Sequence, residues 1–424
     1  MELNSFLFRL GIDPDNFENK LCEPIMEDNK FYYYVTQKKT KEICPTCNST
    51  SLVVKGYYQT QVNMNETDII TDTLIIKRIR YKCKNCNHTF SPEIKGISKY
   101  ATISESTKNK ITNDMFKQLT FKQIADRYGV SITFVINHFD STFKYIPRAK
   151  LPEILCIDEI HFSRDLDQKY ICVLYDYQTR RIIDIIQNRQ LAYLREYFSN
   201  IPKSERDNVK YFISDMYDGY KSIHSSYFPH AIHIVDLFHI ITQLSNAVST
   251  IRIRTMNKVA EPKSKEYNFM KSHWKLFLCR YSKVPNKFYT YKKTNVAYHF
   301  DEMLSICLRL NNEFHIAYNI LQDLYQYNRK QTFESALSFI LYISERLLAC
   351  PSKELNDVGR TYKKWRIEIS NGFTSNKYGI NLSNSVAEGL NNQLKTILKS
   401  AYGYKNFNRF RKRALLILGT FPHK

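Results

Sequence analysis

The sequence contains no apolar run long enough to cross a bilayer, so we expect no membrane-spanning segment in this chain of 424 residues. Its amino terminus, MELNSFLFRLGIDPDN, lacks a cationic lead and a long apolar run, and it does not resemble a secretory signal. Cysteines that lie close to one another in the sequence are also few. Six of the ten cysteines are scattered, mostly within apolar runs where free thiols commonly pack. A reducing cytoplasm is the location that these absences favour.

Acidic residues are few relative to basic residues. The chain has 62 Lys and Arg against 41 Asp and Glu, a formal net charge of +21 and a pI of about 9.4. The imbalance is clustered, because residues 246–300 hold twelve basic residues against two acidic ones and residues 395–424 hold eight against none. A clustered basic excess favours a protein that binds nucleic acid over one that is merely basic.

Two CxxC motifs form the first recognisable site. Cys44-Pro-Thr-Cys47 and Cys83-Lys-Asn-Cys86 can supply four thiolates in tetrahedral geometry to one Zn²⁺. Short segments of β type between the motifs predict hairpin strands, so residues 41–100 are expected to form a zinc ribbon after an N-terminal region at residues 1–40. A redox pair or unrelated packing cysteines would not explain two pairs that flank such a sequence.

Residues 101–146 are predicted to form a helix-turn-helix unit. Gly129 permits a tight turn between the two helices, and Ser131 can cap the second one. The residues predicted to face outward and to contact double-stranded DNA are Thr133, Asn137 and His138. Asn137 is the best candidate for a contact to a base edge in the major groove. An ordinary helical hairpin is the alternative, and the turn spacing and the zinc module before it favour the DNA-binding interpretation.

An α/β region follows a proline-containing linker at residues 145–152. The predicted elements are strands 154–162, 170–175 and 181–186, helix 191–198, strand 209–214, helix 217–227 and strand 231–235. An antiparallel meander that feeds a parallel pair is the plan of a ribonuclease H-like mixed sheet. We therefore predict a catalytic domain from residues 151–248 and 376–424.

The segment between these two parts, residues 249–375, is predicted to be a helical insertion, because its apolar residues recur at helical intervals and strand signals are few. Its basic first half could hold DNA near the active site. The alternative is a solvated helical decoration, and the sequence leaves both possibilities open.

Three carboxylates are the candidate catalytic residues. Asp158 and Asp215 close apolar runs that predict buried strands, and Glu388 lies in an early turn of a predicted helix. Such hard oxygen donors suit Mg²⁺ or Mn²⁺. The expected site holds two ions roughly 3.5–4 Å apart, one activating the attacking oxygen and the other stabilising the leaving oxygen.

Several neighbouring residues compete for this role. Glu159 is expected to face the other side of the sheet from its neighbour Asp158. Asp218 is expected to cap the helix that follows it. Asp236 and His239 lie three residues apart at a strand-to-helix junction, where Asp236 can cap the helix and both can support the metal ligands without binding the ion.

The order of these motifs resembles the ISL3-family bacterial insertion-sequence transposases, which belong to the DDE group. The motifs are the two CxxC pairs, the helix-turn-helix, IDE with Asp158, SDMYDGY with Asp215, VDLFHI with Asp236 and His239, and SNSVAEGLNNQLKTILKSAYGYKNFNRFRKRALL with Glu388. The resemblance covers essentially the whole chain and implies a zinc ribbon, a DNA-binding helix-turn-helix and a ribonuclease H-like catalytic domain with a helical insertion. In the final block, Lys395, Arg409 and Arg411 are expected to contact DNA.

A transposase is therefore the expected function, with element terminal repeats and target DNA as partners and a homodimer on DNA as the expected assembly. One alternative is a zinc-dependent DNA-binding regulator whose sheet domain is not catalytic, but it does not explain three converging acids. Another is a nuclease of the same fold that does not join strands. The resemblance favours the transposase, which would be cytoplasmic and associated with the nucleoid when bound to DNA.

Overall fold

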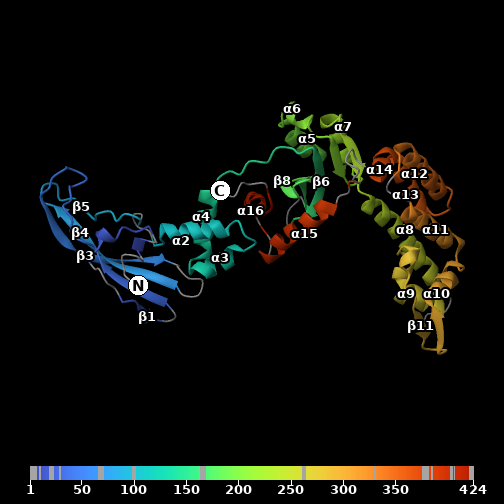
Figure 1. Cartoon of the computed structure of the whole chain (residues 1–424), viewed down its shortest axis with the longest axis horizontal. Helices are drawn as coiled ribbons and strands as arrows, with labels where there is room; N and C mark the ends of the chain where they lie inside the picture. Colours follow the sequence, from blue (N-terminus) through green and yellow to red (C-terminus); the bar gives the residue numbers. More distant parts are fainter. Residues whose placement is uncertain are drawn as a thin grey trace. The chain divides into compact units, whose positions relative to one another are not determined.

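The structure is a computed structural model of the chain (Figure 1). The residues that it describes are 7–8, 11–18, 23–27, 30–64, 71–97, 102–162, 169–259, 264–327, 331–374, 382, 385–401, 404 and 406–419. The chain divides into two compact units, Met1–Pro147 with Thr396–Phe421 and Arg148–Lys395 with Pro422–Lys424. Each unit has its own hydrophobic core. No helix in the described part of the chain is long and apolar enough to cross a membrane.

A mixed sheet forms the first part of the first unit. Its strands are β1 (Ile25–Glu27), β2 (Lys30–Thr36), β3 (Leu52–Met64), β4 (Thr71–Cys83) and β5 (Thr89–Phe90), in the order β1-β2-β4-β3 with β5 beside β4. The long antiparallel hairpin β3–β4 confirms the strands predicted between the CxxC motifs. Because β2 pairs in parallel with β4, part of the expected N-terminal region belongs to the same sheet.

Helices follow the sheet in the described part of the first unit. They include α2 (Glu105–Asp114), α3 (Phe121–Tyr128), α4 (Ile132–Thr142) and α16 (Phe407–Leu418). Thr120 and Gln123 form a capping box at the start of α3, and Gly129 ends the helix in the left-handed conformation at φ 59°. The Ser131 side chain then caps α4 by accepting a hydrogen bond from the Phe134 backbone. These helices and their turn lie where the sequence predicts them, and their DNA-binding role stays a prediction.

Helix α16 belongs to the first unit, which differs from the prediction that residues 376–424 form one piece with the catalytic sheet. Its buried Arg413 donates hydrogen bonds to the carbonyl oxygens of Lys117 (2.9 Å) and Leu119 (2.6 Å). A buried guanidinium needs such partners, because its charge is otherwise left without solvation. These contacts fix α16 against the segment between α2 and α3.

The second unit is built on the sheet β10-β9-β6-β7-β8. Its strands are β6 (Ile154–His161), β7 (Tyr170–Asp176), β8 (Arg181–Ile186), β9 (Tyr211–Ser214) and β10 (Ile232–Val235), joined by helices α5 (Leu191–Ser199), α6 (Lys203–Arg206) and α7 (Asp218–Tyr227). The strands β6, β7 and β8 are antiparallel, and β9 and β10 are parallel to β6, so the predicted strand plan is confirmed. Leu155 and Ile157 point toward the core that includes Leu194 and Phe198 of α5. Cys156 and Asp158, which alternate with them along the strand, face the other side.

Helix α8 (Leu237–Lys258) starts directly after β10 and leads into the insertion. The further elements are α9 (Lys265–Ser272), β11 (Phe288–Tyr291), β12 (Val296–His299), α10 (Phe300–Leu308), α11 (Asn312–Gln326), α12 (Phe333–Leu348), α13 (Lys353–Lys364) and α14 (Arg366–Phe373). The predicted helices are present, but the β11–β12 hairpin was not expected. Helix α14 packs closely on β10, because a Cβ at Gly372 would lie 2.8 Å from the Val235 oxygen.

Candidate catalytic site

The pairing of two parallel strands brings Asp158 and Asp215 to one end of the sheet. The register pairs Ile154 with Tyr211 and Cys156 with Ile213. Continued by two positions, this register puts Asp158 level with Asp215, which follows the last residue of β9. The sequence predicted that these two acids lie on neighbouring strands, and the strand order agrees.

Helix α15 (Ser385–Ser400) contributes the next contact. The Asn391 side-chain nitrogen donates a hydrogen bond of 2.8 Å to Oδ2 of Asp158, and the Asn391 side-chain oxygen accepts one from the Tyr175 hydroxyl. The other oxygen of Asp158, Oδ1, accepts the Glu159 backbone N–H at 2.8 Å. Both oxygens of Asp158 are therefore held in a fixed orientation, with lone pairs left for a further ligand.

Glu388 is exposed and lies one turn before Asn391 on α15. Residues three apart share one side of a helix, so Glu388 is on the side of α15 that meets β6. Lys395 is also exposed, two turns after Glu388 on nearly the same side. Asn384, which could cap this helix, lies outside the described residues.

The environment opposes ionisation of the two sheet acids. Burial raises the pKa of Asp158. Burial and then the charge of Glu159 raise the pKa of Asp215 to about 6, and the Asp158 charge adds to this effect. Buried carboxylates close to each other ionise reluctantly until a cation neutralises them. Oδ1 of Asp215 is also buried without a hydrogen-bond partner among the described residues, which fits a position for a metal ion.

Asp236 and His239 lie beside these acids. Asp236 is buried and caps α8, since its side chain accepts the Phe238 backbone N–H at 3.2 Å, as the sequence predicted. A positive charge on His239 lowers the pKa of both Asp158 and Asp215, and the Asp236 charge raises that of Asp158. The pair is therefore close enough to tune the two acids, and its supporting role stays a prediction.

Glu159 faces the other side of the strand, as expected, and forms an ion pair with Arg189. The guanidinium of Arg189 also lies over the rings of Tyr170 (4.9 Å) and Tyr217 (5.5 Å). Even so, one oxygen of Glu159 is buried without a partner in the described structure, and its charge affects Asp215. Glu159 therefore affects the site through its charge, although its side chain faces the other side of the strand.

The expectation that Asp218 caps its helix is wrong. The N-cap position of α7 is Tyr217, and Asp218 is the first helical residue. The Asp218 carboxylate instead forms an ion pair of 2.6 Å with Lys364 of α13. An acid in the first turn still interacts favourably with the helix dipole, so the helix start loses little by this arrangement.

The three predicted ligands do not approach one another as closely as the four cysteines do. Within the described part of the chain, the group of at least three ligand atoms found within 4.8 Å of one another is the cysteine cluster. The strand register brings Asp158 and Asp215 to the same end of the sheet, and Asn391 of α15 contacts Asp158. The approach of Glu388 to these two acids stays a prediction.

The four cysteines form a compact cluster. Sγ of Cys44 lies 3.5 Å from that of Cys86, and Sγ of Cys47 lies 3.6 Å from that of Cys83. The Cys86 backbone N–H lowers the pKa of Cys83 to about 6. The Ser49 N–H also lowers the pKa of Cys47, but the neighbouring thiols raise it to about 12. Four thiolates so close together need a cation, and this donor set fits Zn²⁺.

Each CxxC motif ends in the same turn. Asn48 and Asn87 follow the motifs with φ of 56° and 60°, and their N–H groups donate to the carbonyl oxygens of Cys44 and Cys83. Asn tolerates this left-handed conformation better than most residues. The sequence Cys-x-x-Cys-Asn, which occurs twice, is the signal from which this turn could have been predicted.

The predicted DNA contacts on α4 have different environments. Thr133 and Asn137 are exposed. His138, expected to face outward, is partly buried, and its Nε2 lies 2.9 Å from the Thr112 hydroxyl of α2. The reason is that α2 covers this side of α4, so His138 joins two helices.

The two predicted arginines of α16 also have partners within the first unit. Arg409 forms a bidentate ion pair with Asp140 of α4, at 2.6 and 3.2 Å. Arg411 donates to the Ile146 carbonyl oxygen at 3.0 Å. Contacts of these arginines to DNA would therefore compete with contacts that hold α16 in place.

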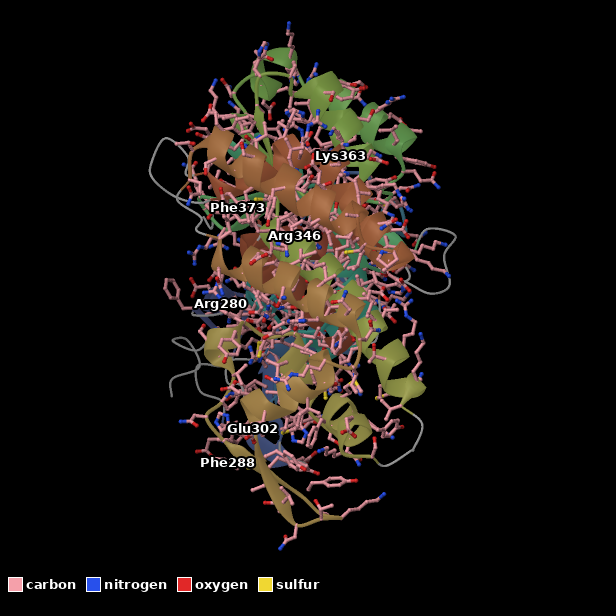
Figure 2. All side chains as sticks on the ribbon, turned by 90° about the vertical axis from the view of Figure 1, so that its right-hand side faces the viewer. Arg280, Phe288, Glu302, Arg346, Lys363 and Phe373 are labelled. Carbon is pink, nitrogen blue, oxygen red and sulfur yellow. The ribbon has the colours of Figure 1, made fainter. Side chains whose placement is uncertain are left out.

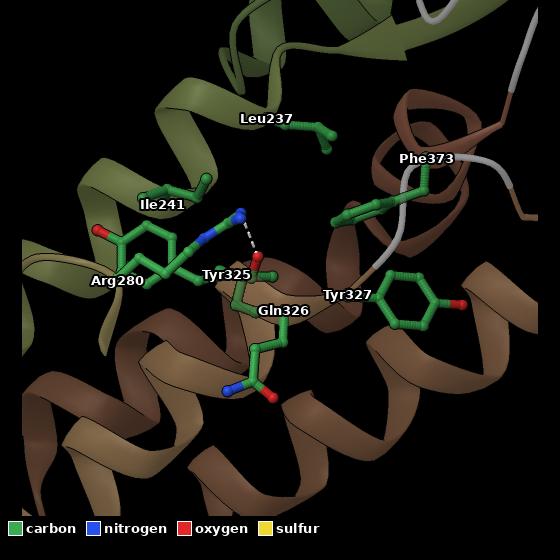
Figure 3. A pocket seen from close by; sticks show the side chains of 8 residues that line it. Leu237, Ile241, Arg280, Tyr325, Gln326, Tyr327 and Phe373 are labelled. Atoms are coloured by element: carbon green, nitrogen blue, oxygen red, sulfur yellow. Dashed lines mark hydrogen bonds between the residues drawn. The ribbon is translucent and has the colours of Figure 1, made fainter. Parts of the chain in front are cut away.

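A cavity of about 510 Å³ lies beside α8 (Figure 3). Leu237 and Ile241 line it from α8, and Arg280 and Phe373 reach it from other elements. His239 lies about 200° around the helix from Leu237, so the cavity is not part of the acidic site. The Arg280 guanidinium is held there by the Tyr325 carbonyl oxygen.

Comparison with known proteins identifies the family. A family described as Transposase, the ISL3 type of DDE transposases, matches residues 155–414, which is more than half of the chain. The chain belongs to this family. The transposase for insertion sequence element IS1001 of Bordetella parapertussis is 23% identical over 271 residues, which cover 64% of this chain and 61% of that protein. The similarity thus spans about three fifths of the length of this relative.

Proposed function

We propose that the chain binds the ends of an insertion sequence, cleaves phosphodiester bonds there and joins the freed 3′-hydroxyl to target DNA. The observation that carries the proposal is the common level of Asp158 and Asp215 on adjacent parallel strands, with Asn391 of α15 bonded to Asp158. Glu388 on the same helix would complete the set. The strand order of this sheet, with α5 on one face and α15 at Asp158 on the other, supports a ribonuclease H-like catalytic domain.

Asp158, Asp215 and Glu388 would hold Mg²⁺ or Mn²⁺. When bound, these ions lower the charge on the phosphodiester and favour ionisation of the attacking hydroxyl. Asn391 and the Glu159 N–H keep the Asp158 carboxylate in one orientation. Asp236 and His239 adjust the charge around the acids, so their replacement should alter metal affinity more than DNA affinity.

The first unit would bind DNA. Its four cysteines would hold a structural Zn²⁺, and Asn137 and Thr133 of α4 would contact base edges. Arg411 of this unit would contact DNA only by giving up the Ile146 carbonyl. Lys395, in the second unit, would contact a phosphate close to Glu388. Two element ends imply at least two copies on DNA, and chromosomal DNA as substrate implies work in the bacterial cytoplasm at the nucleoid.

A strand-transfer assay tests the proposal. Labelled element-end duplex, supercoiled plasmid and Mg²⁺ are incubated with the protein, with Asp158→Asn and with Glu388→Gln. We expect joined product from the wild type and a loss of about 100-fold or more in both variants. Gln393→Ala, at an exposed position of the same helix, is the matched control and should retain activity.

The products separate the alternatives. Cleavage without joined product would identify a nuclease, and binding without cleavage would identify a DNA-binding regulator. Either result contradicts the proposed function. Full activity of Asp158→Asn in Mg²⁺ would contradict the proposed site.

A further inference from the structure

The β11–β12 hairpin has no part in the catalytic site. It extends away from α9 and α10 in Figure 1, and Figure 2 places Phe288 on it. The strands pair over four residues each, from Phe288 with His299 to Tyr291 with Val296. A short turn at residues 292–295 joins them, with Asn295 in the left-handed conformation at φ 54°.

The inner face of the hairpin fixes it to the helices. Tyr289, Tyr291 and Tyr298 place their rings 6.1, 6.4 and 5.3 Å from the ring of Phe269 on α9. Phe269 is fully buried in the core of the insertion. Such aromatic contacts hold the hairpin as a rigid element, in contrast to a loose surface loop.

The outer face is open and partly apolar. Phe288 is 69% exposed, more than any other large hydrophobic side chain in the described part of the second unit. Thr290 and Ala297 share this face and are also exposed. Phe288 and its two small neighbours thus form an exposed face on an element that aromatic contacts hold in place.

Lysines flank this face at both ends of the hairpin. Lys283 and Lys287 lie at its base, and Lys292 and Lys293 lie at its tip. All four are exposed, and no ion pair with a carboxylate is found for them in the described structure. Residues 267–300 contain seven basic residues and no acidic residue. The partner of this surface should therefore carry regularly spaced negative charge.

The dimensions of the hairpin suit the major groove of DNA. From Lys287 to Lys292 the strand advances five residues, or about 17 Å. The major groove is about 12 Å wide and admits a two-stranded β-ribbon. Lysines at the two ends of a ribbon of this length can reach the phosphates on both rims while the face between them meets the bases.

We propose that the β11–β12 hairpin is a second DNA-binding element that lies across the major groove of the DNA substrate. Lys292 and Lys293 bind one backbone, Lys287 and Lys283 bind the other, and Phe288 contacts the base edges. The inference rests on the proposed function for the nature of the substrate. It answers the question that the sequence left open, because the basic half of the insertion then has a defined DNA contact.

Salt titration of DNA binding tests the charges. The probe is a mixed-sequence DNA duplex in EDTA, so binding is measured without cleavage. Lys292→Ala/Lys293→Ala should reduce the slope of log Kd against log salt by about 2 between about 50 and 200 mM. Lys353→Ala/Lys363→Ala removes two exposed lysines of α13 and should leave the slope nearly unchanged. Equal reductions in both double variants would mean that net charge alone matters, and would overturn the proposal.

Groove probes test the position of Phe288. Phe288→Ala should weaken binding roughly tenfold without changing the salt slope, because it removes apolar contact area and no charge. Methylation of guanine N7, in the major groove, should weaken binding of the wild type more than that of the variant, because the α4 contact is present in both. An equal effect of methylation on both proteins would contradict the Phe288 contact. Displacement by a minor-groove ligand with no interference at N7 would contradict the assignment. If DNA binding depends on the hairpin but the protein never cleaves DNA, the proposed function is wrong and the hairpin is still a DNA-binding element.

Discussion

At the scale of single residues, the surroundings of Asp158 and Asp215 favour the protonated form of each carboxyl group. Both are partly buried, and the pKa of Asp215 is raised to about 6. The folded chain therefore holds the Asp215 proton more tightly than the unfolded chain does. Above about pH 6 the ionised residue destabilises the fold, and this penalty disappears as the pH falls toward the ordinary Asp value.

Replacement of Asp215 by Asn should stabilise the metal-free protein. At pH 8 in EDTA we expect Asp215→Asn to raise the free energy of unfolding by about 1 to 3 kcal/mol, and the gain should shrink toward pH 5. Mg²⁺ should raise the melting temperature of the wild type and not of the variant. Asp126→Asn, at an exposed position, is the control and should change neither. A destabilised Asp215→Asn protein at pH 8 would show that the acid is held by contacts of its own.

Asn391 should matter for catalysis through the orientation of Asp158. Asn391→Leu removes the donor to Asp158 and should reduce cleavage by about 10- to 100-fold with DNA affinity unchanged. Gln393→Leu makes a similar change at an exposed position of the same helix and should have little effect. Equal activity of the two variants in the cleavage assay would remove Asn391 from the site.

The residues differ in how far the sequence could assign them. The positions of Asp158 and Asp215 in the sheet were predictable because each follows an apolar run. Asp158 lies within β6, which continues to His161, and Asp215 directly follows β9. The Asn391 contact was not, because its partner lies 233 residues away and the pairing depends on tertiary packing. His138 was misplaced for a related reason, since its outward position on α4 is covered by α2.

At the scale of elements, regular patterns were good predictors and short ones were not. The strands β6 to β10 have continuous apolar runs, and their order followed from the rules for connections. The hairpin β11–β12 has only four residues a strand in a lysine-rich segment, so its alternation was too brief to show. The turn at Gly129 was predictable because a glycine there adopts a left-handed conformation.

The zinc cluster should be needed for the N-terminal sheet, because it joins the two ends of the β3–β4 hairpin through Cys83 and the turn at Cys44. Cys47→Ser should lower the zinc content from about one ion per chain toward zero, and the hairpin should become sensitive to protease. Zinc analysis and limited proteolysis measure both. Cys279→Ser, outside the cluster, is the matched control. Full zinc occupancy in Cys47→Ser would contradict a four-cysteine site.

At the scale of the whole molecule, the sequence suggested one catalytic body and the structure shows a chain that crosses between two units. Helix α15 begins in the second unit with Glu388 and ends in the first, and α16 then packs within the first. The amphipathic pattern of α16 shows that one face is buried but does not show against which partner. The family match extends to residue 414, so it includes most of α16.

The most direct measurement is anomalous diffraction from Mn²⁺ in crystals of the protein with element-end DNA. The account predicts manganese bound by Asp158 and Asp215, with Glu388 as a third ligand at a distance of about 2.1 Å. Manganese bound by Asp158, Asp215 and Glu159, with Glu388 in solvent, would contradict it.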